Sequence, residues 1–230
     1  MEYDISINPE RESTRQAFMT GVYGWMVAAL SLSGVSAWFV ANSVPLQRII
    51  FGNTFVFFGL IIGELALVWW LSASIRKISA SAAVAAFLAY SLLNGATLAS
   101  VFLVYTGQSV VQIFGVTALT FGAMSLYGMK AKSDLRSMGR YLSMAVIGIV
   151  IAIAVNMFFR SSAFDILISI VTVVVFTGLT AWDTQKLMLL ADRADGSDTY
   201  KKVAIIGALE LYLDFINIFL ALIRLFGKRN

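Results

Sequence analysis

The sequence contains no cysteine, no histidine and only two prolines, and just 13% of its residues are charged. The lack of cysteine excludes disulfides, thiol nucleophiles and cysteine-ligated metal sites. Without histidine, a response to pH near neutrality has to come from carboxyl groups in an unusual environment. The low charge content leaves little for a soluble surface, because soluble domains carry about a quarter of charged residues.

Apolar residues are in excess instead. They make up 59% of the 230 residues, and the mean hydropathy is +0.83. A helix surrounded by lipid is apolar on nearly every side, whereas a surface helix of a soluble protein keeps a polar face. The composition therefore predicts an all-α, polytopic membrane protein. The net charge of +4 comes from basic residues in short loops, so we expect contact with the lipid bilayer and not with nucleic acid.

Seven apolar runs are long enough to cross about 30 Å of hydrocarbon at about 1.5 Å per residue. They cover residues 19–41, 52–74, 79–105, 109–128, 140–159, 164–189 and 203–226. The first run is longer than the core of a signal peptide and follows an acidic leader, so we predict a retained helix. The expected organisation is a cytoplasmic segment, 1–18, followed by a single seven-helix transmembrane domain, 19–230.

The basic residues predict how these helices are oriented. With seven spans, twelve of the seventeen basic residues fall on the side of the N-terminus. The positive-inside rule then places the N-terminus in the cytoplasm and the C-terminus outside. The basic end GKRN fits this less well, because a re-entrant final segment would return its charges to the cytoplasm.

The last apolar run carries a polar stripe. Glu210, Asp214 and Asn217 follow one another at steps of four and three, so they share one face of a helix. Carboxylates that face lipid are energetically costly, so this face is expected to line the bundle interior or a water-filled path. Asp183 of the sixth run lies in the same half of the membrane, about 7 Å from Asp214 in depth by helical rise.

Asp183 and Asp214 are the candidate proton sensor. If they meet, two negative charges about 4 Å apart repel by roughly 4 kcal/mol at an effective dielectric constant near 20. Such a pair is expected to hold one shared proton between its two carboxyl groups. The alternative is that each acid only forms a hydrogen bond with a neighbouring helix.

Other polar and small residues lie inside the second and third runs. Glu64 either lines the same ion path or caps a local hydrogen-bond network, and the sequence leaves both open. The GxxxG motif of Gly59 and Gly63 predicts close packing of the second helix inside the bundle. Ser91, Asn94 and Thr97 form a milder stripe, which predicts hydrogen bonds between helices.

Four segments carry a resemblance to a known family: SLLNGATLASVFLVYT, TFGAMSLYGMKAKSDL, GLTAWDTQKL and LYLDFINIFLALIRLFG. Together they resemble the Bax inhibitor motif family, in its bacterial inner-membrane branch, over essentially all seven spans. The resemblance implies six helices around a central polar seventh, and a pH-sensitive calcium leak across the inner membrane. It also implies that Asp183 and Asp214 form the proton-sensing pair, with Arg76 as the nearest match to a latching arginine. Bacterial relatives are further linked to a membrane protease, which makes such a protease a partner to consider.

Calcium is expected as the transported ion and not as a cofactor. Carboxylate oxygens suit a hard cation, yet a leak has to bind it weakly, so we predict no resident metal. The predicted ion path runs along Glu64, Glu210 and Asn217.

Three other functions were weighed against a calcium leak channel. A non-transporting regulator that binds and modulates a membrane protease stays open. An intramembrane aspartyl protease would use paired aspartates to activate water. The YLDF setting of Asp214 lacks the Gly-x-Gly-Asp context that such enzymes resemble, so we do not expect an enzyme. Proton-coupled transport of an organic substrate is disfavoured, because no spans are interrupted by glycine or proline at matching positions.

Overall fold

The computed structural model describes residues 9–230, and this part of the chain folds into eight helices. Seven of them are long and apolar enough to cross a membrane, the exception being the short α2. The prediction of an all-α protein with seven spans is therefore confirmed. The helices are α1 (Pro9–Ala41), α2 (Val44–Phe51), α3 (Thr54–Ser74), α4 (Ala80–Val104), α5 (Gly107–Lys130), α6 (Arg136–Phe159), α7 (Ser162–Ala191) and α8 (Asp198–Phe226).

The helix ends differ from the predicted runs by a few residues in most cases. Helix α1 begins at Pro9, so the segment predicted as a leader, 1–18, is helical from residue 9 onwards. Residues 1–8 lie outside the described part of the chain. Helix α2 was not predicted. Pro45 lies in its first turn, where the missing N–H of proline costs nothing because that position has no partner within a helix.

Short polar side chains begin four of the spans. Each accepts a hydrogen bond from a backbone N–H of the first turn, which otherwise has no partner in the helix. The capping residues are Asn53, Ser79, Thr106 and Ser161. These caps place the helix ends close to where the apolar runs begin.

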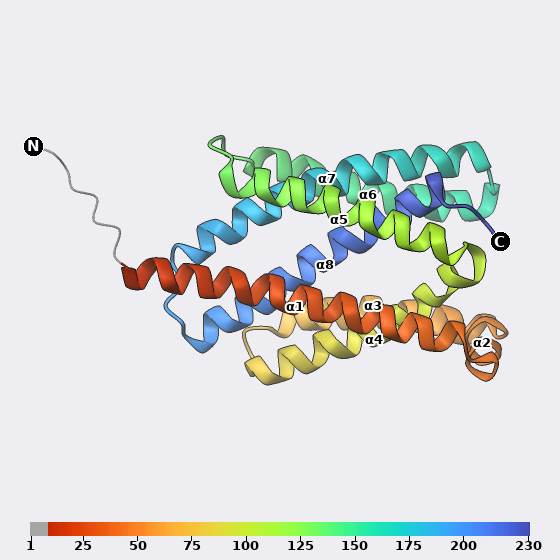
Figure 1. The fold of residues 1–230 in the computed structure, drawn as a ribbon, viewed down its shortest axis with the longest axis horizontal. Coiled ribbons are helices and arrows are strands. Elements are labelled where there is room, and N and C mark those ends of the chain that lie inside the picture. Colours follow the sequence, from red (N-terminus) through yellow and green to blue (C-terminus); the bar gives the residue numbers. More distant parts are fainter. Residues whose placement is uncertain (1–8) are drawn as a thin grey trace, which may run out of the picture.

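Helix α8 crosses between two groups of helices (Figure 1). Helices α1, α3 and α4 lie on one side of it, and α5, α6 and α7 lie on the other. Helix α8 packs directly on α1, α4, α5 and α7, whereas α3 packs chiefly on α4 and α6 packs chiefly on α7. In α8, 67% of the most apolar 18-residue segment is buried, against 6% in α6. The C-terminal helix is therefore the centre of the bundle.

Glycines allow the closest approach of neighbouring helices at particular positions. Gly95 of α4 faces backbone atoms of Ser33 in α1, and Gly128 of α5 faces the carbonyl of Ala181 in α7, so that a Cβ at either site would overlap them. The predicted packing role of Gly59 and Gly63 is wrong, because nothing lies within 4 Å of the Cβ position at either residue. Helix α3 turns a different face, that of Glu64, towards α4.

Helix α1 begins at one end of the bundle, and α8 finishes at the opposite end (Figure 1). Helix α8 is continuous, and the tail that follows it pairs with the connection between α4 and α5. The Thr106 N–H donates to the Lys228 carbonyl at 2.9 Å, and the Asn230 N–H donates to the Val104 carbonyl at 3.0 Å. The final apolar run is thus one uninterrupted helix without a turn back among the described residues. We call the end where α1 begins the N-terminal face, and the end where α8 finishes the C-terminal face.

Candidate functional site

A cluster of charged side chains connects α7 to α8 in the half of the bundle nearer the N-terminal face. The ammonium group of Lys186 donates hydrogen bonds to both carboxylate oxygens of Glu210, each at 2.8 Å. Its Nζ also lies 3.6 Å from Oδ1 of Asp183. One lysine thus balances two acids that come from different helices.

Asp214 is the deepest acid of this region, with only 4% of its surface exposed. Its Oδ2 is buried without a hydrogen-bond partner among the described residues. The Thr180 hydroxyl contacts the Asp214 carboxyl group, and it donates its own hydrogen to the Phe176 carbonyl at 2.8 Å. The nearby charges that act on Asp214 are those of Asp183, Glu210 and Lys186. Asp214 is therefore a carboxyl group with unmet hydrogen-bonding capacity inside a membrane span.

Helical spacing explains why these side chains meet. Asp183 and Lys186 are three residues apart on α7, and Glu210 and Asp214 are four residues apart on α8, so each pair shares one face of its helix. Gly207 faces the Leu187 side chain, and a larger residue there would overlap it. The absence of a side chain at Gly207 lets α8 come close enough for Glu210 to reach Lys186.

The two predicted sensor residues lie on packed helices, with interacting charges. Asp183 is 6% exposed and Asp214 is 4% exposed, so neither faces lipid. Asp183 forms an ion pair with Lys186 and also interacts electrostatically with Asp214, which does not by itself place a proton between the two carboxyl groups. The shared proton therefore stays a prediction.

Lys186 was missed as a site residue, although the sequence held a signal for it. Its position near the end of a predicted span was interpreted only as part of the basic side of the membrane. The spacing of three from Asp183 places both residues on one helical face, which is typical of an ion pair. Lys186 contacts the acids in the way that the resemblance implied for a latching arginine.

Arg76, the predicted latch, lies in the connection between α3 and α4. It lines a cavity of about 560 Å³ together with Lys186, Lys202 and Glu210, but it forms no ion pair among the described residues. Helix α3 packs against the outer side of α4, which keeps Arg76 at the wall of the cavity. The latching role of Arg76 is thus an untested prediction, and Lys186 is the cation that contacts the acids.

Glu64 belongs to a separate hydrogen-bond network. Its carboxylate accepts hydrogen bonds from the Asn94 amide and the Thr97 hydroxyl of α4, each at 3.0 Å. The Tyr212 hydroxyl of α8 donates to Asn94 Oδ1 at 2.8 Å and lies 2.7 Å from the Ser33 hydroxyl of α1. Of the two possibilities left open for Glu64, the geometry favours the local network, which links α1, α3, α4 and α8.

Asn217, the last residue of the predicted ion path, donates its amide hydrogen to the Leu213 carbonyl of its own helix at 2.8 Å. Around this level the neighbours are aromatic. Phe215 packs against Phe114 and Phe121 of α5, with ring centroids 5.2 and 5.7 Å apart, and Phe219 also contacts Phe114. We call Phe114, Phe121, Phe215 and Phe219 the aromatic plug. On α8, Phe215 and Phe219 lie on the face opposite to Glu210 and Asn217, and Phe114 is 45% exposed, so the aromatic plug packs α8 against α5 and does not lie in line with the acids.

Two cavities of very different volume lie along α8. The cavity lined by Arg76, Lys186 and Glu210 measures about 560 Å³ and lies towards the N-terminal face. Beside the plug, an apolar cavity of about 70 Å³ is lined by residues that include Phe114 and Phe219. Glu210 thus lies at a cavity near the N-terminal face, whereas Asp214 and Asn217 line neither of these two cavities.

Comparisons with known proteins match this chain over almost its whole length. The sequence model of a family described as "Inhibitor of apoptosis-promoting Bax1" matches residues 15–230. The inner membrane protein YbhL of Escherichia coli is 49% identical over 217 residues, which cover 94% of this chain and 93% of that protein. A protein of Borreliella burgdorferi is 42% identical and covers 99% of this chain and 98% of its own length. A membrane protein of Streptococcus pyogenes is 37% identical, with 80% of each chain covered.

Proposed function

This chain belongs to the Bax inhibitor family of membrane proteins, and from that premise we propose that it is a pH-sensitive cation leak channel, with calcium as the transported ion. A multi-pass location in the inner membrane agrees with its similarity to an inner membrane protein and with its seven apolar helices. The observation that carries the proposal is the Asp183, Lys186, Glu210 and Asp214 cluster, placed inside two packed spans next to a cavity that leads to one face.

Lys186 acts in this proposal as a tethered cation. Its ammonium group fills the position between Glu210 and Asp183 that a mobile cation would occupy. A divalent ion has to displace this group before it can bind the carboxylate oxygens, which are the ligands that calcium prefers. Calcium binding is therefore weak, as a leak requires. The contact between Lys186 and Glu210 also fastens α7 to α8.

The aromatic plug packs the opposite face of α8 against α5, and in this proposal it holds α8 in its closed position. Phe215 follows Asp214 directly in the sequence, so a change at that carboxyl group is transmitted to the plug through one helix.

The orientation follows from the basic residues. The connections α3–α4, α5–α6 and α7–α8 lie on the N-terminal face and carry most of the lysines and arginines. The positive-inside rule predicts that this face is cytoplasmic. The cavity beside Glu210 then opens to the cytoplasm, and the C-terminus lies outside.

The sign of the pH dependence follows from the charges around Lys186. The titratable and charged groups that face it are Asp183 of its own helix, Glu210 and Asp214 of α8, and Arg76 across the cavity. Acidification protonates carboxylates, and a neutral carboxyl group holds an ammonium ion less strongly than a carboxylate does. The connection between α7 and α8 therefore weakens as the pH falls, and the leak is expected to rise.

The test is calcium flux into proteoliposomes that contain the purified protein, measured at several pH values. In Asp183→Asn and Asp214→Asn the flux is expected to lose most of its pH dependence, because an amide cannot titrate. Asp165→Asn is the matched control, since Asp165 lies in the first turn of α7, far along the helix from the cluster. An unchanged pH profile in both cluster variants would reject the sensor. A wild-type protein without any flux would instead favour the non-transporting regulator of a membrane protease.

A further inference from the structure

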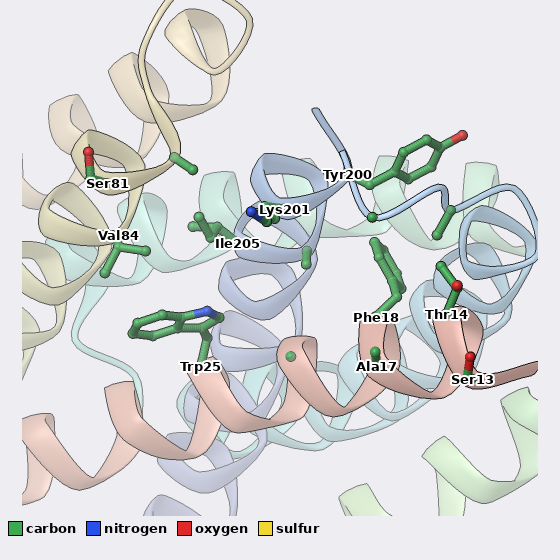
Figure 2. Close-up of a pocket in the computed structure, with 15 residues that line it drawn as sticks. Ser13, Thr14, Ala17, Phe18, Trp25, Ser81, Val84, Tyr200, Lys201 and Ile205 are labelled. Atoms are coloured by element: carbon green, nitrogen blue, oxygen red, sulfur yellow. The ribbon is translucent and has the colours of Figure 1, made fainter. Parts of the chain in front are cut away.

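A second large cavity lies on the other side of α8, between α1, α4 and α8 at the N-terminal face (Figure 2). It measures about 660 Å³. Its lining on α8 includes Lys201, Ala204 and Ile205, whereas the cavity beside the charged cluster is lined by Val203, Ile206 and Gly207. At 3.6 residues per turn these two sets fall on opposite faces of the helix, so the second cavity is separate from the proposed ion path.

The interior of this cavity is apolar and about as deep as one leaflet of a bilayer. Phe18, Gly21, Trp25, Val84 and Ile205 line it. From Ser13 at the rim to Trp25 the lining extends over twelve residues of α1, which is about 18 Å by helical rise. Half of a hydrocarbon core of about 30 Å is about 15 Å, so the cavity matches the reach of one acyl chain.

The rim is polar, and Lys201 is the one charged residue of the described chain that lines the cavity. Lys201 is exposed there and forms no ion pair with any described residue. Of the acids nearby, Asp192 pairs with Arg15 at 3.3 Å, whereas Asp195, which accepts a hydrogen bond from the Ser197 N–H at 2.9 Å, and Asp198 keep their charges but do not line the cavity. The first turns of α4 and α8 also meet this rim, at Ser81 and Tyr200, and the N-terminal end of a helix attracts negative charge.

The geometry points to a binding site for an anionic phospholipid, with one acyl chain in the cavity and the phosphate group at Lys201. Basic side chains between spans on the cytoplasmic side are suited to anionic headgroups, and the apolar interior requires a hydrocarbon chain. A free phosphate ion would leave that interior empty. A zwitterionic lipid would bring a cation of its own beside Lys201, so the charge of the rim selects for a headgroup of net negative charge.

Two pairs of matched variants separate the headgroup from the acyl chain. Lys201→Gln removes the rim charge, and Lys130→Gln removes an equal charge from the end of α5 on the same face. Gly21→Leu fills the cavity, because nothing lies within 4 Å of the Cβ position at Gly21. Gly24→Leu makes the same change in α1, again into open space, at a residue that does not line the cavity.

The experiment is native mass spectrometry of the full-length protein in detergent, titrated with phosphatidylglycerol and, separately, with phosphatidylcholine of the same chains. We expect one phosphatidylglycerol to bind more tightly than phosphatidylcholine. Lys201→Gln should weaken it about fivefold, as expected for one lysine near an anionic headgroup, and Gly21→Leu should abolish it. Both control variants should bind as the wild type does.

Equal binding of the two lipids, or equal loss in Lys201→Gln and Lys130→Gln, would overturn the proposal. Inorganic phosphate is the third compound to be titrated. If phosphate alone binds at Lys201 and Gly21→Leu leaves that binding unchanged, the site takes a free anion and the lipid assignment is wrong. None of these outcomes depends on calcium flux, so the lipid site and the leak can fail separately.

Discussion

Replacement of Lys186 by methionine tests the proposed tethered cation most directly. Methionine keeps a long unbranched side chain and removes the charge. In the described conformation Lys186 Nζ lies 2.8 Å from both oxygens of Glu210, and the two side chains are 37% and 32% exposed. If this ion pair exists only in the closed state, its loss shifts the equilibrium towards the open state.

The size of the shift follows from the partial burial. Removing one partner of a fully buried ion pair costs about 3–5 kcal/mol, and an exposed pair contributes about 0–1 kcal/mol. Because each side chain is about one third exposed, we take an intermediate value of about 2 kcal/mol. At about 1.4 kcal/mol per factor of ten, calcium flux should rise about thirtyfold.

The assay is calcium entry into proteoliposomes at neutral pH, with the amount of protein per vesicle measured for each variant. Lys130→Met is the control for loss of a basic residue, and Lys186→Arg should stay near the wild-type flux because it keeps the positive charge. Circular dichroism and gel filtration show whether the variant is folded. A folded Lys186→Met protein with the flux of Lys130→Met would refute the role of the ion pair.

Three further predictions concern the rest of the bundle. Glu64→Leu should destabilise the protein by about 2 kcal/mol in thermal unfolding, because it removes a buried carboxylate that accepts two hydrogen bonds from half-buried donors of α4, and Glu64→Gln should cost less. Gly128→Ala should lower the unfolding temperature, because the new Cβ meets a backbone carbonyl. Gly59→Ala should have little effect, because its new Cβ enters open space. Equal losses of stability in the two variants would contradict the packing described for α5 and α3. Phe215→Ala should increase calcium flux by loosening the packing of α8 on α5, and Phe159→Ala, at a side chain that is 78% exposed, should not.

The sequence predicts the spans well because the bilayer imposes a strong and local constraint. Each apolar run has to be about 20 residues long, and every one of the seven predicted runs is a helix. The burial of Asp183 and Asp214 was predictable for the same reason, since an ionisable side chain in a span avoids lipid. Glu64 could not be assigned from sequence, because its partners lie on another helix at the same depth.

Contacts between helices were the part that local patterns did not determine. The GxxxG motif permits close packing but does not say on which side of α3 a neighbour lies, and in this bundle no neighbour lies there. Lys186 had a visible partner in Asp183, three residues away. Its stronger partner, Glu210, is on α8, so that contact depends on how α7 and α8 align and on the close approach at Gly207.

The proposed gate requires α8 to move, and we expect this movement in its first half. The end of its second half is held by the tail after Phe226, which forms backbone hydrogen bonds with the α4–α5 connection. The first half lies between two cavities of about 560 and 660 Å³, which leave space for displacement on both sides. The ion pair of Lys186 and Glu210 holds this half against α7. We therefore expect that the proposed path opens where that ion pair breaks, and that Asp214 and Phe215, one turn further along the helix, move with it.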